Sequence, residues 1–299
     1  MQIPLLPSEL HTTERPSITA QWTAVVRALE LDRPEPERIV SDEFAPVFLT
    51  ATSRAVLESL RLGSPLVRRA ERHELAGVSA FVLLRHRFID DQLRDALADG
   101  AEQVVVLGAG YDSRAYRFAD ELRGRPLHEV DLAPLSRRKA EVVAGHPELF
   151  AANTIRRVEI DFRTESLTDR LLDSGFAVGV RTVVIWEGVS MYLTRLAVSA
   201  TLGALREICG VGSRLAMDFW HEPTGRGRYD QARRAAAQAI RLFGEPVTFS
   251  LAPDAAPGFL DRHGFAAVDV AGAAELVARY ATGGRPSEKS LYAVAAQLN

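Results

Sequence analysis

Glycine and acidic residues follow four short apolar runs in the middle of the sequence, and these residue types suit the binding of a ligand. The runs end at Gly108, Asp131, Asp161 and Glu187. In an open parallel sheet, ligands bind outside the carboxyl ends of the strands. If each run is a strand, the four residues line one crevice, where glycine lets a ligand approach the backbone and carboxylates accept its hydrogen bonds.

The segment from Gly108 to Arg114 reads Gly-Ala-Gly-Tyr-Asp-Ser-Arg, which predicts a tight turn with Gly108 and Gly110 facing a ligand. The dinucleotide fingerprint requires a further glycine where this chain has Ser113. Asp112 would also place a negative charge beside a bound pyrophosphate. Both features disfavour NAD and FAD, although a Gly-x-Gly turn by itself is equally compatible with a purely structural role.

Asp131 follows Gly108 at about the 20-residue spacing at which an acid binds the ribose hydroxyls of a nucleotide. The alternative is that Asp131 caps the helix expected from Pro134. A glycine turn, a ribose-binding acid and the lack of a phosphate cradle together indicate an adenosine ligand without phosphates. S-adenosyl-L-methionine is the cofactor that best fits this description.

The next two strand ends carry further candidates for contacts to this cofactor. Asp161 could accept a hydrogen bond from an adenine amino group, and Phe162 could pack on the ring. Their alternative roles are a helix cap followed by a core aromatic. Glu187 would face the amino or sulfonium side of the ligand, and its alternative is a solvated acid at a strand end.

Candidates for the acceptor side follow the fourth and fifth runs. Tyr192 could orient an acceptor and Trp220 could line its pocket, although both are equally explained as packed aromatics. His221 is the histidine best placed to act as a general base, although an exposed loop histidine is the simpler interpretation. A phenol acceptor would need such a base, whereas a carboxylate acceptor would not. No histidine spacing predicts a metal site, and no nucleophile triad is evident.

The pattern of apolar residues predicts how these side chains are positioned. Residues 1–100 have helical spacing and are expected to form a helical cap or lid. Residues 101–299 alternate short apolar runs with helix-length segments, which predicts an α/β fold with a mostly parallel sheet and a helical insertion near 222–245. The expected strands are 104–107, 127–130, 155–160, 182–186, 215–220, 265–270 and 291–295.

The composition excludes several classes of protein. With 36 basic and 39 acidic residues among 299, the chain has a net charge of -3 and lacks the basic excess of a nucleic-acid-binding protein. Its single cysteine, Cys209, cannot form an intramolecular disulfide, and no apolar run is long enough for a membrane helix. We therefore expect a soluble cytoplasmic protein, with Cys209 in the core. Oligomeric state has no signature in the sequence.

Four ordered motifs resemble the leucine carboxyl methyltransferase-like family of class I S-adenosylmethionine-dependent methyltransferases. They are LGAGYDSRAYR at 107–117, EVDL at 129–132, DFRT at 161–164 and WEGVSMYL at 186–193. The sequence RHRFIDD at 85–91 resembles the family's helix before the glycine turn. The resemblance is nearest to the bacterial branch that includes polyketide O-methyltransferases. It implies a Rossmann-like sheet of about seven strands.

The resemblance also implies site residues and a function. Arg85 would pair with the methionine carboxylate of the cofactor. The other implied cofactor contacts are Gly108, Gly110, Asp131 for ribose, Asp161 and Phe162 for adenine, and Glu187 near the methionine moiety. The expected reaction is O-methylation of a carboxylate or hydroxyl on a small molecule, such as a polyketide-like secondary metabolite. The alternatives are a protein C-terminal carboxyl methyltransferase and an NAD(P)-dependent oxidoreductase.

Overall fold

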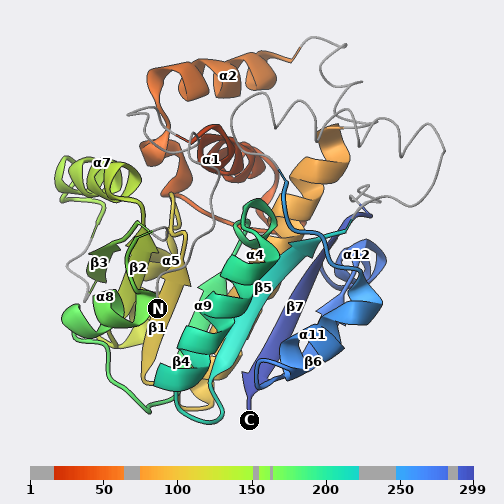
Figure 1. Cartoon of the computed structure of the whole chain (residues 1–299). Helices are drawn as coiled ribbons and strands as arrows, with labels where there is room; N and C mark the ends of the chain where they lie inside the picture. Colours follow the sequence, from red (N-terminus) through yellow and green to blue (C-terminus); the bar gives the residue numbers. More distant parts are fainter. Residues whose placement is uncertain (1–16, 64–74, 151–154, 162–163, 222–246, 282–288) are drawn as a thin grey trace.

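A sheet with seven strands in the described residues forms the centre of the molecule (Figure 1). The computed structural model describes residues 17–63, 75–150, 155–161, 164–221, 247–281 and 289–299. The strands are β1 (Gln103–Leu107), β2 (Leu127–Asp131), β3 (Ile155–Glu159), β4 (Thr182–Trp186), β5 (Arg214–Trp220), β6 (Phe265–Ala271) and β7 (Leu291–Leu298). Their order is β3-β2-β1-β4-β5-β7-β6. Of these strands only β7 runs opposite to the other six, so the predicted mostly parallel sheet is confirmed.

Helices cover both faces of the sheet because its central strands are apolar on both sides. In β1, Val104 and Val106 belong to one hydrophobic core, while Val105 and Leu107 belong to the other. The first core includes side chains of α1 (Ile18–Glu30), α2 (Ala51–Leu62), α4 (Leu75–Ala98) and α12 (Ala273–Tyr280). The second includes side chains of α8 (Leu167–Asp173), α9 (Arg195–Ile208) and α11 (Ala256–Asp261).

The remaining elements are short or lie at the carboxyl ends of the strands. They are α5 (Arg114–Arg117), α6 (Ala119–Leu122), α7 (Ala133–Ala144), η1 (Glu35–Glu37), η2 (Ala45–Phe48), η3 (Ser190–Tyr192) and η4 (Pro253–Ala255). The expected insertion near 222–245 lies outside the described residues.

Helix α4 packs directly on the sheet, against β4, β5 and β7, and against α12. Its apolar residues at helical spacing are fully buried, including Leu84, Phe88 and Leu93. This packing carries the polar residues of the same helix, from Arg85 to Asp90, to the carboxyl ends of the strands.

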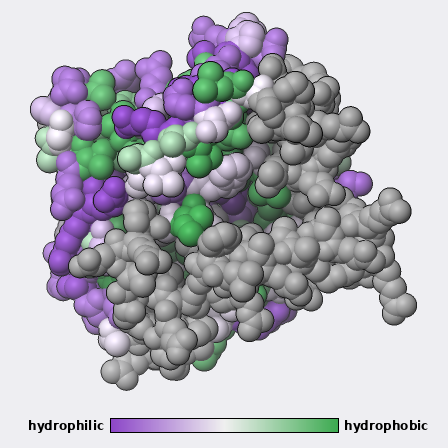
Figure 2. Space-filling model, turned by 90° about the horizontal axis from the view of Figure 1, so that it is seen from above, coloured by the Kyte–Doolittle hydropathy of each residue, from purple (hydrophilic) through white to green (hydrophobic). Residues whose placement is uncertain are grey.

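Helix α1 lies across the carboxyl ends of the parallel strands, with α2 beyond it (Figure 1). A buried ion pair holds it there: Arg27 donates through Nη1 to Asp42 at 2.5 Å and through Nη2 to the carbonyl of Tyr111 at 2.9 Å. Viewed from above, this face of the protein mixes hydrophilic and hydrophobic residues (Figure 2). Helix α1 is therefore fixed to the glycine turn by a buried charged group as well as by apolar contacts.

We predict that Asp42→Asn destabilises the protein by about 3–5 kcal/mol, because it leaves the buried Arg27 guanidinium without its counter-charge. Urea unfolding at neutral pH measures this loss. Burial opposes ionisation of Asp42, but Arg27 and its neighbours hold the pKa of that carboxyl below its usual value. A depressed pKa stabilises the fold above the unfolded value near 3.8, so wild-type stability should fall as the pH drops through this region.

Arg61→Ala is the matched control, since Arg61 pairs with Asp32 at 2.8 Å and also joins α2 to the end of α1. Both partners of that pair are solvent-exposed, so we expect a loss of only about 0–1 kcal/mol. Equal losses in the two variants would show that the buried pair has no special role in holding the cap.

Candidate functional site

The strand-end residues expected from the sequence meet at one edge of the sheet. β2, β1, β4 and β5 are consecutive neighbours, so the turn at Gly108 and the residues Asp131 and Glu187 lie at the same carboxyl edge. Asp161 lies next along this edge, after β3, and is half-buried. Phe162 lies outside the described residues.

Asp131 is tied to the glycine turn. Its Oδ2 accepts a hydrogen bond from the Gly110 backbone at 2.6 Å, and its Oδ1 accepts one from the Leu132 backbone at 2.7 Å. The capping position of α7 is occupied by Leu132, so Asp131 does not cap that helix. A carboxylate has about four lone-pair sites, and two remain for hydroxyl donors. Burial raises the pKa of Asp131 to about 6.

Two glycines allow chain segments to pass closely at this edge. Gly108 has φ of 64°, and a Cβ there would lie 2.4 Å from Cγ2 of Val189. Any larger residue at position 108 would therefore clash with Val189 unless one of the two segments moved. Gly188 has φ of 70°, and a Cβ there would lie 3.2 Å from Nη2 of Arg85. The turn after β1 and the loop after β4 therefore require glycine for steric and conformational reasons.

A buried charge cluster lies beside these glycines. Its members come from α4, the glycine turn, α5, the loop after β4, and β5: Arg85, His86, Asp90, Asp112, Arg114, Arg117, Glu187 and Asp218. With His86 neutral, three guanidinium groups face four carboxyl groups. When all four are ionised, the cluster carries one negative charge in excess.

Arg85 is buried within this cluster. Its Nε donates to Glu187 at 3.0 Å and its Nη1 donates to Asp218 at 2.9 Å. Asp218 also accepts a bond from the backbone of Gly188 at 2.6 Å, and burial raises its pKa. Arg87, by contrast, forms a pair with Asp91 and has an exposed side chain. Of the two neighbouring arginines, Arg85 is the one that reaches the strand ends.

Arg114 is the most connected member of the cluster and is fully buried. Its Nε donates to Asp90 at 2.7 Å, its Nη2 donates to Glu187 at 2.7 Å, and its Nη1 pairs with Asp112. Arg117 donates to the other oxygen of Asp90 at 2.7 Å. The charge of Asp112 is therefore compensated by Arg114. Repulsion between Asp112 and a pyrophosphate is then no longer a strong argument against a dinucleotide.

Glu187 remains ionised despite its burial. Desolvation opposes the charged form, but His86, Arg114 and Arg85 hold the pKa of Glu187 well below its usual value. Its side chain is 12% exposed, more than any of its three neighbours in this contact. Glu187 is thus a fixed anion at the boundary between the cluster and the space above the strand ends.

Sequence reasoning missed His86, Asp90, Arg114, Arg117 and Asp218 as members of this site. A signal was present for each: His86 and Asp90 are four residues apart on one helix, Arg114 and Arg117 are three apart, and Asp218 interrupts an apolar strand. Arg114 and Arg117 did not stand out because the chain contains many other arginines.

The acceptor-side candidates occupy the other part of the edge. Trp220, buried at the end of β5, and Tyr192, half-buried in η3, pack in the hydrophobic core that also contains α1 and α4. His221 is not a freely exposed loop residue, because its Nε2 donates to the carbonyl of Lys289 at 2.9 Å. A carbonyl only accepts, so Nε2 is not the atom of this ring that could remove a proton.

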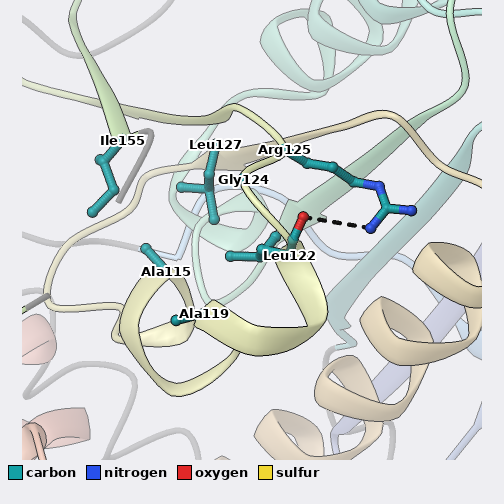
Figure 3. A pocket seen from close by; sticks show the side chains of 7 residues that line it. All are labelled: Ala115, Ala119, Leu122, Gly124, Arg125, Leu127 and Ile155. Atoms are coloured by element: carbon teal, nitrogen blue, oxygen red, sulfur yellow. Dashed lines mark hydrogen bonds between the residues drawn. The ribbon is translucent and has the colours of Figure 1, made fainter. Parts of the chain in front are cut away.

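Other features of the described residues offer no competing site. They contain no group of acidic, histidine or cysteine side chains that could hold a metal ion, and none of their helices is both long and apolar enough to cross a membrane. Cys209 is buried as expected, and burial raises the pKa of its thiol to about 12. A small hollow lies at the opposite edge of the sheet, where β2 and β3 begin, lined by Leu127 and Ile155 (Figure 3).

Comparison with known proteins identifies the family. A model of the family described as leucine carboxyl methyltransferase matches residues 20–206. A Rhodococcus jostii protein named "Putative S-adenosyl-L-methionine-dependent methyltransferase" is 34% identical over 228 residues, which are 76% of this chain and 74% of that protein. A Streptomyces coelicolor protein with the same name is 33% identical over 252 residues, covering 83% and 82%.

The fold is shared with a solved structure. The crystal structure of a "putative methyltransferase" from Thermobifida fusca has a TM-score of 0.60 at 13% identity, covering 96% of this chain and 97% of that chain. The expected methyltransferase fold is thus confirmed. With the family model matching well over half of its length and relatives above 30% identity, the chain belongs to the leucine carboxyl methyltransferase family.

Proposed function

We propose that the chain transfers a methyl group from S-adenosyl-L-methionine to a carboxylate or hydroxyl oxygen of a small molecule, such as a polyketide-like metabolite. The coarser activity follows from the family: the chain is a methyltransferase that depends on S-adenosyl-L-methionine, as its relatives are named. The oxygen acceptor and its small size are the parts that we infer.

The observation that carries the proposal is the Asp131 carboxylate fixed against the glycine turn. Both of its oxygens are oriented by backbone N–H groups and each keeps capacity for another donor. This pair of acceptor oxygens suits the two hydroxyls of a ribose. Gly110 has φ of 45°, a left-handed backbone conformation that favours glycine at this position of the turn.

The buried charge cluster suits the methionine moiety. Its excess negative charge is complementary to a ligand that carries a sulfonium and an ammonium group, and Glu187 is the anion nearest to the surface. The Arg85 guanidinium has five N–H donors, of which Nε and one on Nη1 bind carboxylates in the protein. The remaining donors of Arg85 would bind the methionine carboxylate, with Asp161 and Phe162 left to contact adenine.

The acceptor part of the site has two tasks, which are to position the acceptor and to exclude water. The bound cofactor supplies a methyl group that is already activated by the sulfonium. The protein's task is to align an acceptor oxygen with it and to exclude water. Helix α1, held by the hydrogen bond from Arg27 to Tyr111, covers this edge, and Tyr192 and Trp220 belong to the apolar core beneath it. An edge covered in this way favours a small acceptor over a protein chain.

The nature of the acceptor decides whether a base is needed. A carboxylic acid with pKa about 4 is ionised at neutral pH, whereas a phenol near about 10 is protonated. His221 could serve a phenol only through Nδ1, because Nε2 is bound to Lys289. A carboxylate acceptor requires no such group. The oxidoreductase alternative is dropped, because the family is one of methyltransferases.

Methyl-labelled cofactor tests the acceptor class directly. We expect label to appear in members of a panel of aromatic carboxylic acids and phenols, with mild alkali releasing it from esters but not from ethers. Peptides with a free C-terminal carboxylate form the comparison arm. Label confined to those peptides would support the protein carboxyl methyltransferase alternative, and label on nitrogen or carbon would contradict O-methylation.

We predict that Asp131→Asn weakens S-adenosyl-L-methionine binding by about tenfold or more, because a hydrogen bond to a charged group contributes roughly 1.5–3 kcal/mol. Calorimetric titration at pH 8 measures the effect. The wild-type affinity should also fall as the pH drops through about 6, since Asp131 gains a proton there and loses acceptor capacity. That pH dependence should be absent from Asp131→Asn.

Glu159→Gln provides the control, because Glu159 is the register partner of Asp131 on β3 and forms an exposed pair with Arg137. We expect its affinity to stay within about twofold of wild type. If Asp131→Asn bound as well as this control, the ribose assignment would be wrong.

A further inference from the structure

His86 lies in the middle of the buried charge cluster, between Glu187 and Arg117. It is on α4 and is 3% exposed. Its Nδ1 lies 3.0 Å from Oε2 and 3.2 Å from Oε1 of Glu187, and its Nε2 lies 2.7 Å from Nη2 of Arg117. Each ring nitrogen therefore faces a partner whose hydrogen-bonding character is fixed.

One protonation state satisfies both contacts. The ionised Glu187 carboxylate can only accept, so Nδ1 must carry a hydrogen. The Arg117 guanidinium can only donate, so Nε2 must present its lone pair. An imidazolium would direct an N–H at Arg117, and the Nε2–H tautomer would direct an N–H at Arg117 and a lone pair at the Glu187 carboxylate. The geometry thus selects the neutral Nδ1–H form of His86.

Arg114 is compatible with this form. Nη2 of Arg114 lies 2.9 Å from Nδ1 of His86. The same Nη2 donates to Glu187 at 2.7 Å and to the His86 carbonyl at 3.1 Å. Two hydrogens on Nη2 serve these two oxygens, so Nδ1 is not needed as an acceptor.

The charged surroundings of the ring also favour the neutral form. Burial, and then the charge of Arg114, lower the pKa of His86. The charged groups that face the ring are Glu187, Asp90 with Oδ1 at 4.0 Å from Nε2, Asp42, Asp112, Arg114 and Arg117.

We propose that His86 is a positioning residue for methyl-donor binding, whose Nδ1–H fixes the Glu187 carboxylate in the orientation that receives the donor's ammonium group. This inference rests on the role proposed above for Glu187. The other donors to Glu187, from Arg85 and Arg114, are cations. A neutral donor orients the carboxylate without cancelling its charge, so the cluster keeps the excess negative charge that attracts a cation.

The tautomer can be measured in the wild-type protein. Long-range proton–nitrogen NMR spectra of protein with labelled histidine distinguish Nδ1–H from Nε2–H rings. The sequence has seven histidines, and the His86 signals are those missing from the His86→Asn spectrum. We expect Nδ1 protonated and Nε2 bare between pH 6.5 and about 8. A proton on Nε2, alone or together with Nδ1, overturns the inference.

Two substitutions separate the two nitrogens. In His86→Asn the side-chain NH2 can replace Nδ1–H, whereas in His86→Gln it lies nearer the position of Nε2. We expect His86→Asn to bind S-adenosyl-L-methionine within about threefold of wild type, and His86→Gln to bind about tenfold more weakly. The KM for the methyl donor should rise in His86→Gln while the KM for the acceptor stays unchanged. Equal affinities of the two variants for the methyl donor, with equal melting temperatures, overturn the proposal.

Glu187→Gln distinguishes this failure from failure of the proposed function. If Glu187→Gln weakens binding and His86→Gln does not, the role of His86 is wrong while that of Glu187 stands. If Glu187→Gln binds normally, both are wrong. Adding His86→Gln to Glu187→Gln should cause no further loss, because His86 acts through that carboxylate. His128→Asn, at a buried histidine of β2 bonded to Ser174, controls for loss of a buried ring.

Discussion

The arrangement of the site depends on the ion pairs that the Arg114 guanidinium forms. It joins three parts of the chain that are far apart in sequence: Asp90 of α4, Asp112 of the glycine turn and Glu187 after β4. A buried charge is tolerated only when it is paired and hydrogen-bonded, so each of these carboxylates must stay where Arg114 requires it. The planar group with five donors also fixes their directions, which lysine could not do.

The same constraint extends from the sheet to the cap. Asp42, which holds α1 through Arg27, is also influenced by Arg117 and by a hydrogen bond from Ser113. Helix α1 and the charge cluster therefore share one electrostatic environment, in addition to the hydrophobic core that joins α1 to α4. Moving α1 away from the strand ends would separate buried charges. The free-energy cost of that movement is therefore higher than for a helix held by apolar contacts alone.

The sequence predicts the sheet well because the relevant signals are local. The run 182–186 is a strand in the structure, and Asp131 was found because its spacing from Gly108 follows from one strand, one turn and one helix. Asp218 and Arg114 were missed because their partners lie far along the chain, so no local pattern specifies them. The one strand whose direction was not specified, β7, depends on pairing with β5 and β6.

The two parts of the strand-end edge have different chemistry, and this division has a physical reason. Charges gather around Glu187, which under the proposed function faces the cationic part of the methyl donor. Apolar side chains such as Trp220 gather under α1, where charge would not assist transfer of a group that is already activated. A neutral donor at His86 is consistent with this division, since it adds orientation without adding charge. Under the proposed function, shape rather than charge would select the acceptor, because the side chains on that side of the edge are apolar.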